Sequence, residues 1–203
     1  TFPAEDGGWV YVSNSESVPG GVGALRFDAA GQVIDAYQIL AGTIINCAGG
    51  PTPWGTWLSC EEIPTGRVHE CNPFGGILDA RARPALGIFD HEAVAVDPVR
   101  RQLFLTEDAG DATFYRFVPS AIDWPAGAER PALEDGALQV MVVPGVADSR
   151  DIPFESDPVP WEEDDQSQQL IATIVPAKGF QGEFDYLVPD KLADQLQVGC
   201  RVD

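Results

Sequence analysis

Apolar and polar positions alternate in a pattern that occurs three times along this chain. Short alternating stretches run into a hydroxyl residue and then carboxylates: "WVYVSNSE" ends at Glu16, "GTWLSCEE" at Glu62 and "QLFLTED" at Asp108, with 46 residues between successive ends. A second strand-like stretch follows each one, namely "GALRFD", "GRVHECNP" and "ATFYRFVP". Alternation of this kind is typical of half-buried β-strands. A period of about 40–50 residues with several short strands per unit predicts β-propeller blades.

The predicted fold class is therefore all-β, a partial propeller of about three blades. We expect antiparallel blades over residues 8–119. Two stretches in this range predict hairpins, because alternating strands flank a Gly- or Pro-containing turn: "ALRFDAAGQVIDAYQIL" and "EAVAVDPVRRQLFLTED".

The pattern weakens after about residue 120. One convincing strand, "ALQVMVV", lies among Pro, Asp and Glu, and "WEEDDQSQQ" indicates a solvated linker. Residues 170–203 predict strand, strand, turn and strand with a different spacing. We therefore place a boundary near residue 166, with residues 1–165 as the partial propeller and 166–203 as a separate fragment.

The repeat also predicts a site. Cys47 precedes Glu62 by fifteen positions, and Glu92 precedes Glu107 by the same fifteen. Cys47 and Glu92 are thus equivalent positions in successive blades. Because blades converge on a central axis, a thiol and a carboxylate at these positions can meet around a metal ion.

The donor types suit two kinds of metal. Hard carboxylate oxygens suit calcium, and a soft thiolate suits iron. The strand-end carboxylates Glu62 and Asp108 are candidate further ligands, although such residues also cap turns. For Cys47, a metal ligand and a buried structural thiol both remain open. The sequence does not separate the candidate ligands from three acidic neighbours: Glu61, Glu107 and Asp111.

Other residues with reactive or binding side chains favour structural roles. Cys60 alternates with Glu61 and is expected to face the sheet packing, and His69 to be a partly exposed strand residue. His91 is expected either to orient a ligand or to pack in the core. The remaining candidates are expected in the core or in tight connections, and only weakly as a platform or phosphate cradle: Trp54, Trp57, Gly49 and Gly50.

Charge narrows the possible partners. The chain has 12 basic and 32 acidic side chains, a net charge of −20 and a pI of about 4.1. Such an excess repels phosphate backbones and anionic lipid and favours cations. The four cysteines contain no CxxC pair, and a disulfide between two of Cys47, Cys60 and Cys71 stays open. No apolar run reaches 18 residues.

Three stretches resemble the PhoX-type calcium-dependent alkaline phosphatases. These are "NCAGGPTPWGTWLSCEE" (46–62), "ALGIFDHEAVAVDP" and "LFLTEDAGDATFYRFVP", and the resemblance covers roughly residues 5–163. It implies a six-bladed propeller with iron and calcium at its axis, hydrolysis of phosphate monoesters, and export to the periplasm or beyond. It also implies that Cys47 is an iron-ligating thiolate and Glu92 a metal-bridging carboxylate, both catalytic, with Glu62 and Asp108 as further ligands.

The end of the chain departs from that family. Residues 168–203 are similar to the start of the primosomal replication helicase N′, a DNA-binding domain, although the net charge of −20 argues against nucleic acid as a partner. The sequence also begins at Thr1 without a charged and apolar leader, and we expect a mature or truncated product. The resulting hypothesis is a phosphatase that is weakly active or inactive in this form and that self-associates through an open sheet edge. The alternative is a non-catalytic calcium-binding or interaction propeller domain.

Overall fold

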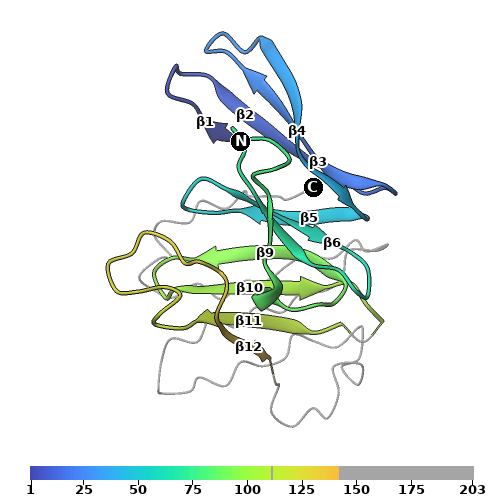
Figure 1. Cartoon of the computed structure of the whole chain (residues 1–203), viewed down its shortest axis with the longest axis vertical. Helices are drawn as coiled ribbons and strands as arrows, with labels where there is room; N and C mark the ends of the chain where they lie inside the picture. Colours follow the sequence, from blue (N-terminus) through green and yellow to red (C-terminus); the bar gives the residue numbers. More distant parts are fainter. Residues whose placement is uncertain (111, 142–203) are drawn as a thin grey trace, which may run out of the picture. The chain divides into compact units, whose positions relative to one another are not determined.

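The structure is a computed structural model, and it describes residues 1–110 and 112–141, all within the unit Thr1–Ser149. These residues form three four-stranded antiparallel sheets, each built from four consecutive strands (Figure 1). They contain no α-helix; a single 3-10 turn, η1, covers Pro84–Leu86. None of the described helices is long and apolar enough to cross a membrane. The all-β prediction is confirmed.

The first sheet, sheet A, follows the predicted hairpin and extends beyond it. Its strands are β1 (Phe2–Pro3), β2 (Trp9–Ser15), β3 (Gly20–Phe27) and β4 (Val33–Thr43). Alternation divides this sheet into two faces, because Val10 and Val12 of β2 pack in an apolar core while Tyr11 between them is 47% exposed.

Sheet B and sheet C repeat this strand order. Sheet B comprises β5 (Asn46–Pro51), β6 (Trp57–Glu61), β7 (Val68–Cys71) and β8 (Arg81–Ala82). Sheet C comprises β9 (His91–Asp97), β10 (Gln102–Glu107), β11 (Phe114–Pro119) and β12 (Gly136–Val140). The predicted second hairpin is β9–β10, and the predicted strand "ALQVMVV" gives β12. A four-stranded meander is the strand order of a propeller blade.

Apolar side chains fill the space between successive sheets. One core cluster joins Leu58 and Val68 of sheet B to Leu103 and Phe117 of sheet C, all with no exposed surface. A second joins Val10 of sheet A to Cys71 of sheet B. Burying such side chains is worth roughly 1.5–3 kcal/mol each, so these clusters hold neighbouring sheets face to face.

Strands β5 and β9 approach each other closely at Gly50. A Cβ at this position would lie only 1.9 Å from the Val94 carbonyl oxygen, so glycine is needed for the backbones to meet. The predicted Gly49-Gly50 pair therefore has a packing role. It also brings the first strands of sheets B and C side by side, which matters for the site.

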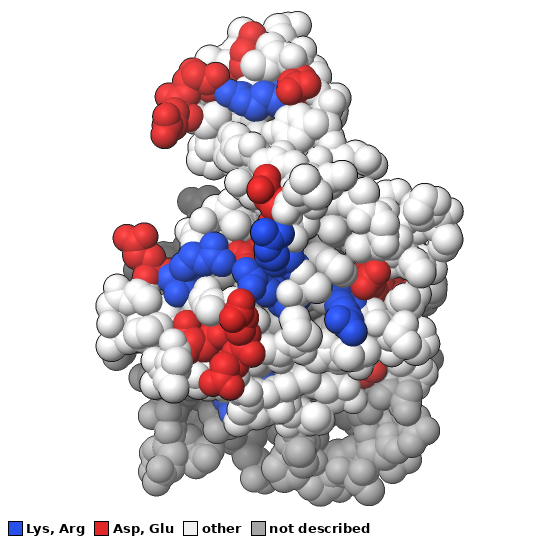
Figure 2. Space-filling view, viewed as in Figure 1, with Lys and Arg blue, Asp and Glu red and all other residues white. Residues whose placement is uncertain are grey.

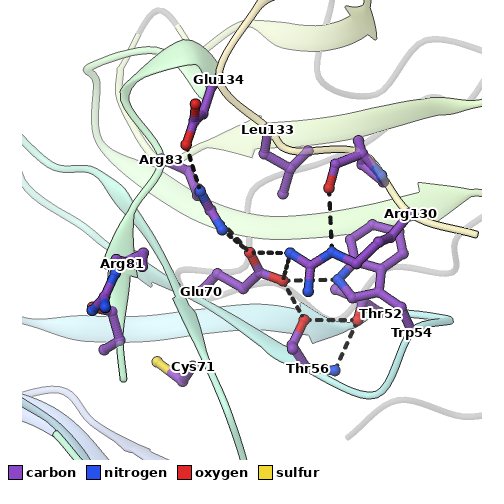
Figure 3. A network of polar contacts seen from close by, with 12 residues as sticks. Thr52, Trp54, Thr56, Glu70, Cys71, Arg81, Arg83, Arg130, Leu133 and Glu134 are labelled. Atoms are coloured by element: carbon purple, nitrogen blue, oxygen red, sulfur yellow. Dashed lines mark hydrogen bonds and ion pairs between the residues drawn. The ribbon is translucent and has the colours of Figure 1, made fainter. Parts of the chain in front are cut away.

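A polar network connects sheet B to the β11–β12 connection (Figure 3). Glu70 of β7, 4% exposed at its side chain, accepts hydrogen bonds from Arg83 at 2.5 and 2.9 Å and from Arg130 at 3.0 and 3.1 Å. Trp54 and Thr56 donate at 2.8 and 2.7 Å. Burial alone would raise the pKa of Glu70, but these donors outweigh it and the pKa lies below its usual range.

Basic side chains gather over the middle of one face (Figure 2). Arg81, Arg83 and Arg130 line a pocket of about 360 Å³ beside Glu70. Glu70 pairs with Leu58 near the start of β6, whereas Glu62 follows the other end of that strand. The arginine network and the predicted metal site therefore lie at opposite ends of β6.

Candidate metal centre

Three carboxylates occupy the same place in the three sheets. Glu16, Glu62 and Asp108 are each the first residue after the second strand of a sheet, β2, β6 and β10. In two sheets the same backbone hydrogen bond fixes that residue. Glu62 N donates to Ile45 O at 2.9 Å, and Asp108 N donates to Asp90 O at 3.1 Å.

The first strands of sheets B and C carry matching β-bulges. In sheet B, Asn46 pairs with Glu61 and Gly49 with Ser59, so Cys47 and Ala48 together oppose the single residue Cys60.

In sheet C, His91 pairs with Glu107 and Val94 with Leu105, so Glu92 and Ala93 together oppose Thr106. A bulge re-aims side chains by inserting one extra residue into a strand. Cys47 and Glu92 are thus equivalent in fold, because each is the first residue of its bulge. The spacing differs by one residue, since Cys47 precedes Glu62 by fifteen positions and Glu92 precedes the matching Asp108 by sixteen.

The equivalent residues converge. The Cys47 thiol donates a hydrogen bond to Glu92 Oε1 at 3.4 Å. Donor atoms of Glu16, Cys47 and Glu62 lie within 4.8 Å of one another, and so do those of Glu62, Glu92 and Asp108. Glu62 belongs to both groups and links them. We call these residues the thiol–carboxylate cluster: Glu16, Cys47, Glu62, Glu92 and Asp108.

The cluster concentrates negative charge in a partly buried place. Burial raises the pKa of Glu92, and the charges of Glu62, Asp108 and Glu16 raise it further, against the hydrogen bond from Cys47. Burial also raises the pKa of the Cys47 thiol well above its ordinary value, with Glu92 and Glu62 adding to the rise. A bound cation would relieve both effects, because it stabilises thiolate and carboxylate together.

The donor set suits the metals implied by the resemblance. Four carboxylates provide hard oxygen ligands for calcium, and one thiol at their edge provides a soft ligand for iron. Cys47, Cys60 and Cys71 are all free, so no disulfide occupies the Cys47 sulfur.

Comparison with protein families agrees with this picture. The model of the alkaline phosphatase PhoX family matches residues 21–72 and 65–200. The chain belongs to the PhoX family. Comparisons with curated proteins and with solved structures find no match. PhoX membership indicates an alkaline-phosphatase-like hydrolase with a phosphate-ester substrate, and it is consistent with a metal cofactor.

The PhoX match continues to residue 200, through the stretch where we expected an unrelated fragment. The resemblance of residues 168–203 to the helicase therefore has no support. The predicted boundary near residue 166 and the predicted fragment lie outside the described residues.

The structure separates acidic neighbours that the sequence left equivalent. Glu61 accepts hydrogen bonds from the backbone of Ile44 and Arg67, at 3.0 and 3.2 Å, and lies 3.1 Å from His69 Nε2. Its counterpart Glu107 accepts from Thr113 N at 3.0 Å and from the Tyr115 hydroxyl at 3.2 Å. Both residues stabilise local backbone, whereas Glu62 and Asp108 belong to the cluster. Asp111 lies outside the described residues.

The remaining candidates have the structural roles expected of them. Cys60 is fully buried in the core between sheets B and C, Trp54 packs against that core, and Trp57 packs against the other. His91 is fully buried, its ring lies tilted against that of Phe89 with 3.6 Å between centroids, and its Nε2 lies 3.2 Å from Gly87 O. Burial lowers the pKa of His91 to about 4. Of its two expected roles, core packing is the one these contacts describe.

Sequence reasoning missed Glu16 as a site residue. Its signal was present, because it ends the first of the three repeated stretches 46 residues before Glu62. The structure places it with Cys47 and Glu62.

Proposed function

We propose that this protein is a metal-dependent phosphomonoester hydrolase that binds calcium and iron at the thiol–carboxylate cluster. One observation carries the proposal: one thiol and four carboxylates from three sheets bring their donor atoms within 4.8 Å of one another in two groups that share Glu62. Like charges gathered in a partly buried place repel one another and do not stabilise the fold, so their clustering points to a role in binding.

The residues divide the work by donor type. Cys47 would hold iron through its thiolate, and Glu92, Glu62 and Asp108 would hold the metals through their carboxylates. Glu16, beside Cys47 and Glu62, joins them as an additional carboxylate ligand. When bound, the cations supply Lewis-acid stabilisation of the charge on a transferring phosphoryl group. The protein residues would hold the cations in place and fix the geometry of the donor atoms.

We also propose that residues 1–203 by themselves bind calcium weakly and turn over slowly. The described part contributes three sheets, whereas propellers close with about four to eight blades. Metal affinity depends on the number of ligands and on site rigidity. We propose a periplasmic or extracellular location, because members of the PhoX family are typically exported.

The alternative is a non-catalytic calcium-binding or interaction propeller domain. It is favoured by the outer face of sheet A, where Tyr11, Leu25 and Ala36 lie in register across three strands and line a pocket of about 480 Å³. An exposed apolar face of this kind suits another protein surface. The proposed self-association, in contrast, would use an open sheet edge.

The deciding experiment is a hydrolysis assay on purified residues 1–203 loaded with calcium and iron, with p-nitrophenyl phosphate as substrate. Slow turnover that Cys47→Ala and Glu92→Gln both abolish is the expected result. Calcium binding in calorimetry with no turnover in any variant would favour the alternative. Rapid turnover that Cys47→Ala abolishes would refute the proposal that residues 1–203 bind calcium weakly and turn over slowly.

A further inference from the structure

The bulge that carries Cys47 depends on a side chain from another sheet. Asn14 of β2 donates from Nδ2 to Cys47 O at 3.2 Å and to Ala48 O at 2.6 Å. These are the two residues that oppose the single Cys60, so neither is in a regular pair with β6. Asn14 therefore hydrogen-bonds both carbonyls of the bulge.

The other side of the Asn14 amide is also fully used. Its Oδ1 accepts from Trp57 Nε1 at 2.9 Å and from Ser59 Oγ at 3.1 Å. An indole N–H can only donate, so the amide oxygen must face Trp57 and the amide nitrogen must face the carbonyls. The four contacts leave this side chain one orientation.

The same residue connects two parts of the cluster. Asn14 lies on β2, two positions before Glu16, which is the first residue after that strand, and its hydrogen bonds end on the backbone of Cys47 and Ala48. One side chain thus relates the strand that leads to Glu16 to the strand that carries the thiol.

We propose that Asn14 is a positioning residue, which holds the Cys47–Ala48 bulge and so aims the thiol into the cluster; its effect on metal binding rests on the proposed function. The four side-chain hydrogen bonds of Asn14 all end on atoms other than the donor atoms of the cluster. It acts through the backbone of Cys47, as partners behind metal ligands do elsewhere.

Two variants test this on the full chain. Asn14→Ala removes all four hydrogen bonds. Asn14→Asp keeps the acceptor toward Trp57 and Ser59 but turns a carboxylate oxygen toward the two carbonyls. Trp57→Phe is the matched control, because it removes one hydrogen bond to Asn14 and leaves both bonds to the bulge. Circular dichroism checks that each variant folds.

The first readout needs no metal. In a Cys200→Ser background, with Cys60 and Cys71 buried, alkylation reports on Cys47. Both Asn14 variants should be alkylated about fivefold faster or more, because the bulge opens when its hydrogen bonds are lost. Trp57→Phe should stay within about twofold of the parent chain. Equal rates in the parent and both Asn14 variants would overturn the proposal, as would an equal rise in Trp57→Phe.

The second readout is the thiolate-to-metal absorption band formed with Co²⁺. Both Asn14 variants should bind Co²⁺ about tenfold more weakly or more, with a shifted or missing band. An unchanged band and affinity would contradict the proposal. If Cys47→Ala keeps the parent band, the ligand role of Cys47 in the proposed function fails. The alkylation rates then still decide whether Asn14 holds the bulge.

Discussion

The Cys47 thiol lies 3.4 Å from the Glu92 carboxylate, and the two residues occupy the same bulge position in successive sheets. The contact therefore joins two structurally equivalent residues, one on β5 and one on β9. It is the structural basis for the predictions that concern the cluster.

Glu92→Gln should stabilise the metal-free protein while weakening metal binding. The substitution removes the charge of Glu92, which burial and the like charges of Glu62, Asp108 and Glu16 disfavour. Because Glu92 is only half buried, the gain should be small, with Tm higher by about 2–4 °C, the change that roughly 1 kcal/mol produces in a chain of this size. Differential scanning calorimetry with and without calcium measures both effects. A lower Tm in the metal-free variant would indicate a structural role instead.

Glu16→Gln should weaken calcium binding less than Glu62→Gln does. Glu16 belongs to one donor group and is exposed, whereas Glu62 belongs to both groups. Titration calorimetry on the two variants gives the comparison. Equal losses, or no loss in Glu16→Gln, would remove Glu16 from the proposed ligand set.

Thr106→Val should loosen the bulge of sheet C. The Thr106 hydroxyl accepts a hydrogen bond from Ala93 N at 3.0 Å, and valine has nearly the same shape without the acceptor. Leaving a fully buried N–H unpaired costs about 1–3 kcal/mol; this N–H is partly buried, so urea denaturation should show a loss of about 1 kcal/mol. Thr106→Ser keeps the hydroxyl and should lie close to the parent chain. If the two variants are equally stable, this hydrogen bond does not support the bulge.

Gly50→Ala should force β5 and β9 apart. The added Cβ would meet the Val94 carbonyl oxygen, a backbone atom that cannot rotate away. Overpacking of this kind costs about 1–3 kcal/mol. The control is Gly55→Asn, since a Cβ at Gly55 meets nothing within 4 Å and asparagine tolerates its φ of 83°. Denaturation midpoints compare the two, and a stable Gly50→Ala chain would contradict the close approach.

Glu70→Gln should lower the free energy of unfolding strongly, because it leaves Arg83 and Arg130 without their shared carboxylate. Breaking a buried ion pair costs about 3–5 kcal/mol. Glu134→Gln is the matched control: Glu134 is 75% exposed and 3.6 Å from Arg83 Nη1, and its loss should cost about 1 kcal/mol or less.

The Glu70 effect should also depend on pH. Its folded-state pKa is lowered, so its stabilisation is complete above the unfolded value of about 4.3 and is lost as pH falls through the folded value. The stability difference between the parent and Glu70→Gln should therefore shrink in acid below about pH 4. A difference that stays constant from pH 7 to pH 3 would mean that the charge of Glu70 is not what stabilises the network.

The repeat in the sequence predicted the central strands because β2, β6 and β10 alternate cleanly and end in carboxylates. It did not predict β1 and β8, since two residues each are too few to show any period. It also predicted that Cys47 and Glu92 are equivalent. The bulges beneath them were not predictable, because an extra residue in a strand changes the register without leaving a mark in composition.

The distinction between Glu61 and Glu62, and between Glu107 and Asp108, likewise lies in the three-dimensional structure and not in the sequence. Neighbouring carboxylates at a strand end are chemically alike in sequence. Glu61 and Glu107 accept hydrogen bonds from backbone N–H groups, and these bonds identify them as the members of each pair that support the sheet. Whether the three sheets belong to a closed propeller stays a prediction.

Three of the four carboxylates of the cluster stand one residue beyond their strands, whereas Glu92 lies within β9. Since Glu16, Glu62 and Asp108 follow the last ladder residues of β2, β6 and β10, exchanging any of these side chains leaves the ladders intact. The scaffold and the ligand set can thus change independently over evolutionary time. Proteins with this architecture can acquire a different metal preference by single substitutions, at little risk to the sheets that support them.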